Sequence, residues 1–401
     1  MLRSIPLPAL LILASGFLIL FIGGGARMAI GLTLRPMVED LNWGRDDVGL
    51  AVGVFQIASA VCTFYAGRLA DRMSLRLVLG FGLLVAAAGI GLMAFVQAPW
   101  QALALYGLVF AIGNGAASTA PVGVMVTRAF PERAGLANSL ALAGMSVGQL
   151  VIVAALAAVL TNVGWRSVFL WLGLAHLAIL PLILASAPGR SAEKARRAAA
   201  PPQEGLTLRE AARTRQFWML LGIYAICGLD DFFVATHVVA FAQDNGVSSI
   251  VAGNLFALMG LTGLAGVVWA GFASDRHGPV WPTLVSFSLR LAVFGLVLVD
   301  QSSVAIAVFA LTFGFTFLVT APVTVLFIRE SFGTRHLGAI GGLITMVHHG
   351  FGGLGAWLGA RVYDAGGAYW PAFLTMFVAT LAAMGLTLAY KAAPASPRNR
   401  S

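Results

Sequence analysis

Two adjacent carboxylates, Asp230 and Asp231, lie near the middle of residues 222–244, an apolar segment long enough to cross a bilayer. A charged side chain at mid-bilayer costs at least about 2.5–3.5 kcal/mol on insertion scales. Such a residue is usually retained facing a bundle interior or a wet cavity, beside a partner. Because a carboxyl group can take up and release a proton, the pair is a candidate proton carrier.

Two arginines also lie inside apolar segments. Arg27 follows three glycines in the first segment, and Arg290 belongs to residues 281–299. A guanidinium presents a planar bidentate fork to a carboxylate and stays charged at any physiological pH. We expect Arg27 to anchor an anion, and protonation of a neighbouring acid would then favour anion binding. The alternative is a static ion pair that only locks helices together. Arg290 is expected to neutralise Asp230 from behind, to snorkel, or to contact the substrate.

Three histidines accompany these charges. His237 lies two helical turns after Asp230 on nearly the same face, where it could relay protons or hydrogen-bond a substrate, although a lone histidine is more often a satisfied interior residue. His348 and His349 are adjacent in a glycine-rich span, and at least one should face the interior. Their side chains point about 100° apart on a helix, so we expect no metal site from them. Further candidate substrate contacts, with interhelical hydrogen bonding as the alternative, are Asn114 and Gln149.

The composition places these residues in a polytopic membrane protein. Of the 401 residues, 59% are hydrophobic and 10% are charged, whereas soluble domains carry about 25% charged residues. The N-terminal apolar run exceeds the length of a signal-peptide core, so we interpret it as the first transmembrane helix. The two cysteines lie inside predicted spans and provide neither a disulfide framework nor a zinc site. Without a nucleotide motif, the expected energy source is an ion gradient or exchange, and no cofactor is expected.

Twelve apolar windows predict twelve transmembrane helices. The even-to-odd connections and both termini hold 19 Lys/Arg against 7 Asp/Glu, whereas the odd-to-even connections hold 4 against 7. The positive-inside rule therefore places both termini in the cytoplasm. The formal charge of +9 is mainly a topology signal, and no nucleic-acid partner is expected. The predicted spans are about 7–34, 46–66, 77–97, 101–127, 135–160, 165–187, 216–241, 249–272, 281–299, 303–328, 337–360 and 368–390.

The two halves of the chain repeat. GRLADR at residues 67–72 recurs as GFASDR at 271–276, an offset of 204, and TAPV at 119–122 recurs at 320–323, an offset of 201. Matches in order at nearly constant offset indicate two related bundles. The predicted organisation is a six-helix bundle at 1–187, a flexible cytoplasmic linker at 188–215 and a second six-helix bundle at 216–401.

The loop GRLADRMSLR at residues 67–76 carries a family resemblance. It resembles the signature G-x-L-x-D-R-x-G-R-[KR] of the major facilitator superfamily, and the resemblance covers essentially the whole chain. Ser74 and Leu75 depart from that pattern, which usually has Gly and a basic residue there. The resemblance implies that the two halves rock about a site at the membrane midplane, and that residues at the cytoplasmic mouth act as a gate. The alternative is that the arginines of these loops only determine the membrane topology. The expected gating residues are Gly67, Asp71, Arg72, Gly271, Asp275 and Arg276.

Residues 25–55, 236–246 and 347–370 look like the monocarboxylate and oxalate–formate branch of bacterial facilitators. Members of that branch generally move small organic anions, many with protons. In the branch an arginine in helix 8 anchors the substrate, whereas residues 249–272 carry no charge here. The cation must therefore come from elsewhere, and Arg27 is our first choice.

The repeat supports that choice. Adding 204 to Arg27 gives Asp231, and the fold implied by the resemblance places their helices on opposite walls of a central cavity. We expect the two side chains to face each other near the substrate.

Together these patterns predict an all-α integral membrane protein with twelve transmembrane helices in two pseudo-symmetric six-helix bundles. The expected function is transport of a small organic anion, a monocarboxylate, with a proton across a bacterial inner membrane, by a functional monomer. Proton-coupled export of an apolar or cationic drug is the alternative. A central cavity in which the exposed charged side chains are acidic would indicate that function. An enzyme is not expected, because no convergent nucleophile or metal set is found.

Overall fold

The computed structural model describes residues 6–130, 134–187, 205–333 and 336–392, and these are almost entirely helical. Within those ranges the only β pairing is an isolated bridge between Gly205 and Gly333. The first half contains α1 (Leu7–Leu41), α2 (Arg45–Arg72), α3 (Leu75–Leu92), the 3₁₀ turn η1 (Met93–Phe95), α4 (Pro99–Ala102), the π-helical η2 (Leu103–Phe110), α5 (Ala111–Ala116), α6 (Thr119–Ala129) and α7 (Ala134–Ser186). The second half contains α8 (Leu208–Ala211), α9 (Arg215–Asp244), α10 (Ser249–His277), α11 (Val280–Val299), α12 (Ser303–Phe317), α13 (Thr320–Phe332), α14 (Leu337–Gly366) and α15 (Trp370–Ala392).

The helices are long and apolar enough for a multi-span membrane protein. Among the described residues nine could cross a membrane by length and composition, and ten if the bent pair of α12 and α13 is one span. α7 is one of these, although Gly164, with φ 74°, divides it into two helices. Counting the two parts of α7 separately gives eleven. α14, at 30 residues, is long enough to cross but is not among the helices that are also apolar enough, so the twelfth predicted span rests on its length alone.

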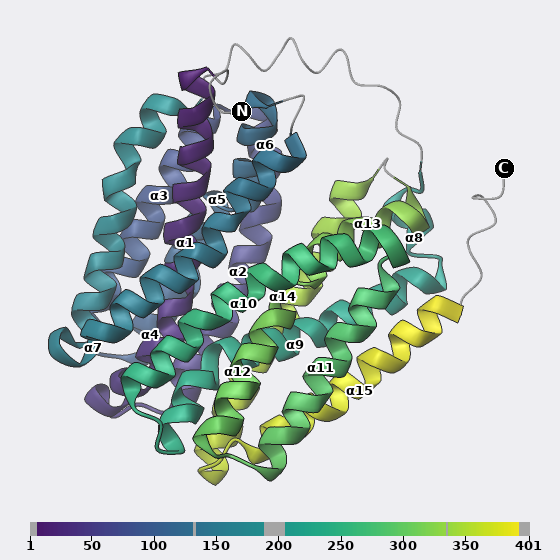
Figure 1. Ribbon diagram of the computed structural model, residues 1–401. Helices are drawn as coiled ribbons and strands as arrows, with labels where there is room; N and C mark the ends of the chain where they lie inside the picture. The colour runs from purple at the N-terminus through teal and green to yellow at the C-terminus, as the bar shows by residue number, and fades with distance from the viewer. Residues whose placement is uncertain (1–5, 131–133, 188–204, 334–335, 393–401) are drawn as a thin grey trace.

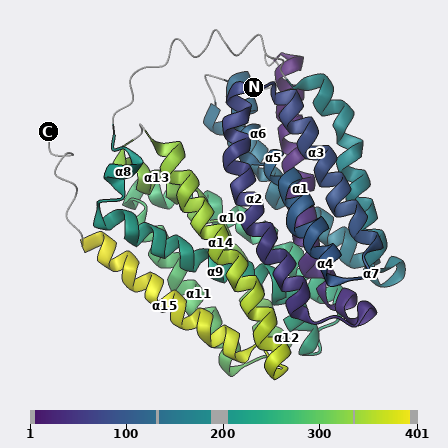
Figure 2. The same cartoon turned by 180° about the vertical axis from the view of Figure 1, so that it is seen from behind.

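The helices form two groups that lie side by side, α1–α7 and α9–α15 (Figures 1 and 2). Within the groups, α1 packs along α7 and α14 packs along α9, whereas the pairs α2–α14 and α7–α10 join one group to the other. The start of α1, the end of α15 and α8 lie at one end of the molecule, where the groups diverge (Figure 1). At the opposite end the two groups converge.

Small residues allow the long helices to pack closely. A Cβ atom added to Gly148 of α7 would overlap the backbone oxygen of Phe21 in α1, so only glycine fits at this crossing. Close approach of backbones at small residues is typical of helix contacts in membranes.

The converging end is closed by ion pairs that the sequence did not predict. Arg45, at the start of α2, binds both carboxylate oxygens of Asp244 at the end of α9, with N–O distances of 2.7 and 2.9 Å. Its guanidinium stacks 3.6 Å from the ring centroid of Tyr363 and donates to the Tyr369 hydroxyl at 2.8 Å. Because Arg45 belongs to the first half and its three partners to the second, this clasp holds the halves together.

We expect Arg45→Gln to open the clasped end. The substitution leaves the Asp244 carboxylate without its bidentate partner, and losing one member of such a charge pair at an interface costs about 2–5 kcal/mol. Pulsed electron-resonance distances between spin labels at Asn42 and Gln301, one in each half, should lengthen or broaden. Arg166→Gln is the matched control, because Arg166 pairs with Asp40 inside the first half at 3.4 Å. An unchanged distance distribution in Arg45→Gln would contradict the prediction.

The end of the segment predicted as a flexible linker is ordered. The Leu206 N–H donates to the Phe332 carbonyl at 2.8 Å, and Thr207 caps the short α8. Gly205 and Leu206 therefore pair with the end of α13, and residues 207–214 form a capped helical turn instead of a free connector. Residues 188–204 lie outside the described part of the chain.

Candidate functional site

The two carboxylates of α9 are enclosed with an arginine of α11. Asp230, Asp231 and Arg290 are at most 2% exposed. Arg290 lies 2.6 Å from an Asp231 oxygen and 3.7 Å from an Asp230 oxygen, and the Thr380 hydroxyl donates to Asp230 at 2.8 Å. Arg290 also donates to Thr316 of α12. Two ionised carboxylates sharing one guanidinium would leave this cluster with one excess negative charge.

Close packing of α9 against α14 brings a histidine to this cluster. A Cβ atom on Gly228 would overlap the His348 backbone oxygen, so glycine is required for the two helices to approach this closely. The approach places His348 Nε2 3.7 Å from the Asp231 Oδ2 atom. The His348 side chain is 16% exposed, so the cluster has one partly accessible member.

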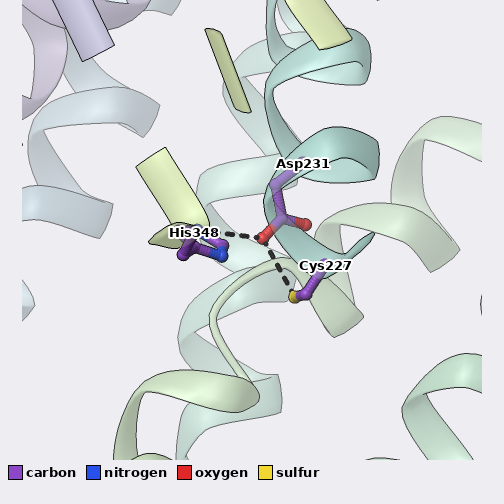
Figure 3. A group of neighbouring side chains, drawn as sticks. All are labelled: Cys227, Asp231 and His348. Atoms are coloured by element: carbon purple, nitrogen blue, oxygen red, sulfur yellow. Dashed lines mark hydrogen bonds and ion pairs between the residues drawn. The ribbon is translucent and has the colours of Figure 1, made fainter. Parts of the chain in front are cut away.

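Two groups approach the Oδ2 atom of Asp231 (Figure 3). The Cys227 thiol donates to it at 3.4 Å, and His348 Nε2 faces it. The other His348 nitrogen, Nδ1, lies 3.2 Å from the Tyr224 carbonyl oxygen and must donate its hydrogen there. In a neutral ring Nε2 is then an acceptor. Two acceptors that face each other are stabilised by a cation between them.

Arg27 is placed differently from the prediction. Its guanidinium carbon lies 5.8 Å from the ring centroid of Phe232, the residue after Asp231, and its side chain is partly exposed. Among the described residues no carboxylate lies within ion-pair distance of Arg27, and its Nε is buried without a hydrogen-bond partner. The expected pair of Arg27 with Asp231 does not form, and Arg290 pairs with Asp231 instead. Arg27 is left with unused donors.

Phe232 connects Arg27 with both adjacent histidines. Its ring centroid lies 5.7 Å from that of His348 and 5.4 Å from that of His349. The His349 Nδ1 donates to the Thr345 carbonyl at 2.9 Å, so its Nε2 is an acceptor in the neutral ring. The candidate site therefore combines a cation from the first half with two imidazoles and a buried acidic cluster from the second.

Other predicted substrate contacts lie elsewhere. His237 is 1% exposed; it donates from Nε2 to the Ala356 carbonyl at 2.7 Å and accepts from the Tyr369 hydroxyl at 3.1 Å. It therefore matches the satisfied interior histidine given as the alternative, and it joins the clasp through Tyr369. Gln149 donates to the Phe256 carbonyl between α7 and α10, and Asn114 donates to Ser59 within the first half.

Arg290 adopts one of the three arrangements expected from the sequence. It neutralises the carboxylates from behind, whereas substrate contact would require an exposed guanidinium, and this one is 0% exposed. The sequence did not point to Phe232, Thr316, Thr380 or Cys227. Of these residues, only Cys227 could have been placed near Asp231 from the sequence, because it precedes Asp231 by four residues and therefore lies on the same helix face.

The predicted gating residues lie at the diverging end. Asp275 and Arg276 are exposed near the end of α10, and a Cβ atom on Gly271 would meet open space. A Cβ atom on Gly67 would be 3.5 Å from Ala120 of the same half. The side chains of Asp71 and Arg72 lie outside the described part of the structure. Their gating function stays a prediction.

The chain is similar to known transporters over most of its length. It is 27% identical to monocarboxylate transporter 13 of Rattus norvegicus over 351 residues, 85% of this chain and 78% of the relative. It is 25% identical to the oxalate:formate antiporter of Oxalobacter formigenes over 276 residues, 68% of this chain and 65% of the relative. The crystal structure of the nucleoside transporter NupG superposes with a TM-score of 0.75 at 14% identity, covering 97% of this chain and 100% of that one.

The family profile described as Major Facilitator Superfamily matches both halves, over residues 16–236 and 220–401. The two matches agree with the internal repeat and with the two groups of helices. The relatives and the structural neighbour are transporters and not enzymes. The chain is therefore a multi-pass membrane transporter of the Major Facilitator Superfamily.

Proposed function

We propose that this protein moves a small organic anion, a monocarboxylate, together with a proton across the inner membrane of a bacterium. The observation that carries the proposal is the separation of charge in the core. Arg27 is an unpaired, partly exposed cation, whereas the carboxylates of Asp230 and Asp231 are enclosed with a single guanidinium. Arg27 needs an anion, and the acidic cluster needs a cation.

Arg27 supports an anionic substrate. Its Nε has no partner, although buried polar groups are nearly always hydrogen-bonded, so a bound carboxylate would satisfy it. A relative named as a monocarboxylate transporter and one named as an oxalate:formate antiporter match this chemistry. Export of a cationic drug would instead require exposed acidic charge in the core, and Asp230 and Asp231 are buried.

The cluster around Asp231 supports coupling to a proton. The His348 Nε2 and Asp231 Oδ2 atoms are two acceptors 3.7 Å apart, and one proton between them removes both their repulsion and the excess negative charge. Because only His348 among these residues is appreciably exposed, the proton would reach Asp231 through the imidazole. Neutralising the cluster as Arg27 takes up an anion keeps the core balanced, which is our physical reason for coupled movement.

The arrangement of the halves supports alternating access. The Arg45 clasp closes one end, and the helices diverge at the other, where α1 begins and α15 ends (Figure 1). With the termini in the cytoplasm, as the positive-inside rule predicts, this conformation opens inward. Rocking of the two halves would break the clasp and join the predicted gating residues. One chain supplies all of the described site residues, so a monomer suffices.

The proposal is tested with the purified protein. Thermal-shift screening of short carboxylates should find ligands, and those ligands should accumulate in proteoliposomes when the entry side is acidic. Collapse of the proton gradient by a protonophore should abolish accumulation. Stabilisation by lipophilic cations but by no carboxylate would reject the anion as substrate.

We expect the double substitution Asp230→Asn and Asp231→Asn to stop proton-driven accumulation while sparing anion exchange. The amides keep the shape of the carboxyls but cannot carry a proton, whereas Arg27 still binds the anion. Because Arg290 loses its charged partners, both rates are normalised to the amount of folded transporter. The measurement compares gradient-driven uptake with exchange of labelled for unlabelled substrate in the same proteoliposomes. The matched control is Asp300→Asn, a carboxylate in the connection between α11 and α12 that accepts hydrogen bonds from the N–H and hydroxyl of neighbouring Ser302. Unchanged gradient-driven uptake in the double variant would count against proton coupling here.

A further inference from the structure

Three different metal-binding atoms converge between α9 and α14 (Figure 3). The Cys227 Sγ lies 3.4 Å and the His348 Nε2 lies 3.7 Å from Asp231 Oδ2, and all three atoms lie within 4.8 Å of one another. In a tetrahedral zinc site, with Zn–S of about 2.3 Å and Zn–N or Zn–O of about 2.0–2.2 Å, neighbouring ligand atoms are about 3.4–3.6 Å apart. The two separations measured from Asp231 are close to that spacing. No metal was expected from the sequence, neither a zinc site from the two cysteines nor a site from the adjacent histidines, whereas the fold brings one cysteine and one histidine together with a carboxylate.

Each of the three atoms has an outer partner of the kind found around metal ligands. The His348 Nδ1–H donates to the Tyr224 carbonyl, which orients the ring and leaves the Nε2 lone pair free. The other Asp231 oxygen, Oδ1, is held by Arg290 at 2.6 Å, so Oδ2 remains available. The Thr320 hydroxyl lies 3.7 Å from the Cys227 sulfur, where it can donate to a thiolate.

The charges of the cluster also fit a divalent cation. Two ionised carboxylates and Arg290 sum to one negative charge. A divalent cation that displaces the thiol proton of Cys227 adds two positive charges and one negative, which brings the cluster to zero. Calcium or magnesium would not suit this set, because those ions prefer oxygen ligands, whereas thiolate and imidazole suit zinc.

We propose that Cys227, Asp231 and His348 form a binding site for a thiolate-preferring divalent cation of the zinc type. The ion enters past His348, the ligand with 16% exposure, and its fourth coordination position is filled by water or by a substrate carboxylate. Binding ties the α9 carboxylate to α14 and removes it from the proposed transport cycle. Zinc ions therefore inhibit transport.

Cobalt reports directly on this site, because a cysteine ligand gives a near-ultraviolet thiolate-to-cobalt absorption that other ligands do not. The experiment adds Co²⁺ to the purified full-length chain after removal of any affinity tag. The chain has two cysteines, so two substitutions decide which one binds. We expect the absorption in the wild type and in Cys62→Ala, with one Co²⁺ per chain, and its displacement by Zn²⁺.

Cys227→Ala should abolish the absorption, and His348→Ala should weaken Co²⁺ affinity at least about tenfold, as the loss of metal-site residues commonly does. His349→Ala is the matched control, since its ring is adjacent but is not one of the three ligands. A single symmetrical gel-filtration peak shows that each variant is folded. Absence of the absorption in folded wild type, or its persistence in Cys227→Ala, would overturn the site.

The experiments test the metal site and the proposed function independently. If no carboxylate is transported but the cobalt absorption depends on Cys227, the site stands and the anion proposal falls. If carboxylates are transported and no cobalt absorption is seen, the site falls and the transport proposal stands. Where both hold, Zn²⁺ should inhibit uptake in the wild type at concentrations at least about tenfold lower than in Cys227→Ala.

Discussion

Arg27→Gln is expected to abolish uptake of every anionic substrate while leaving the folded protein in the membrane. Arg27 makes no ion pair among the described residues, so its removal leaves no carboxylate without a partner. What it removes is the binding group itself. Charge-assisted hydrogen bonds contribute about 1.5–3 kcal/mol each, so losing a bidentate contact should lower affinity by at least about 100-fold.

Two variants make this expectation specific. Arg27→Lys keeps the charge but loses the planar fork, so it should retain weak uptake and lie between the wild type and Arg27→Gln. Arg166→Gln is the control for loss of an arginine outside the site, because the Arg166 side chain is 41% exposed and pairs with Asp40 of the same half at 3.4 Å. Initial uptake rates normalised to the amount of folded transporter provide the measurement. Wild-type uptake by Arg27→Gln would exclude Arg27 as the anchor.

Arg290→Met is expected to have the largest effect on stability. The substitution leaves Asp230 and Asp231 enclosed without a guanidinium, and breaking a buried ion pair by removing one partner costs about 3–5 kcal/mol. Methionine fills part of the same volume, so the loss measures charge more than packing. The free energy of unfolding in mixed detergent and SDS micelles should fall by that amount.

Restoring the charge balance should restore stability. In the triple variant Arg290→Met, Asp230→Asn and Asp231→Asn the cluster holds no charge, and such replacements are often neutral or stabilising. We expect it to regain most of the lost free energy of unfolding while remaining inactive in proton-driven uptake. If Arg290→Met were as stable as the wild type, the carboxylates would not depend on Arg290, and the charge count behind the proposed proton coupling would be wrong.

The chain's architecture could be predicted from its sequence because each of its causes is local. An apolar run of about 20 residues must become a helix when it enters a bilayer, since every backbone polar group has to be paired within the segment. The repeated loops at offsets of 201 and 204 then gave two related halves, and the family profile confirms the family on both. Arg27, Asp230 and Asp231 could be singled out as candidates from the sequence, because charged residues are rare in apolar segments.

The tertiary structure alone decided how these charges are paired. Arg290 is 59 residues beyond Asp231 in the chain, and it reaches Asp231 only because α9, α11 and α12 pack around one point. The clasp of Arg45 with Asp244 likewise joins the two halves across 199 residues. Hydropathy and repeats report on which residues enter the membrane and in what order. They carry no information on which face of one helix meets which face of another, and that contact is fixed by the fit of small residues such as Gly228 against a neighbouring backbone.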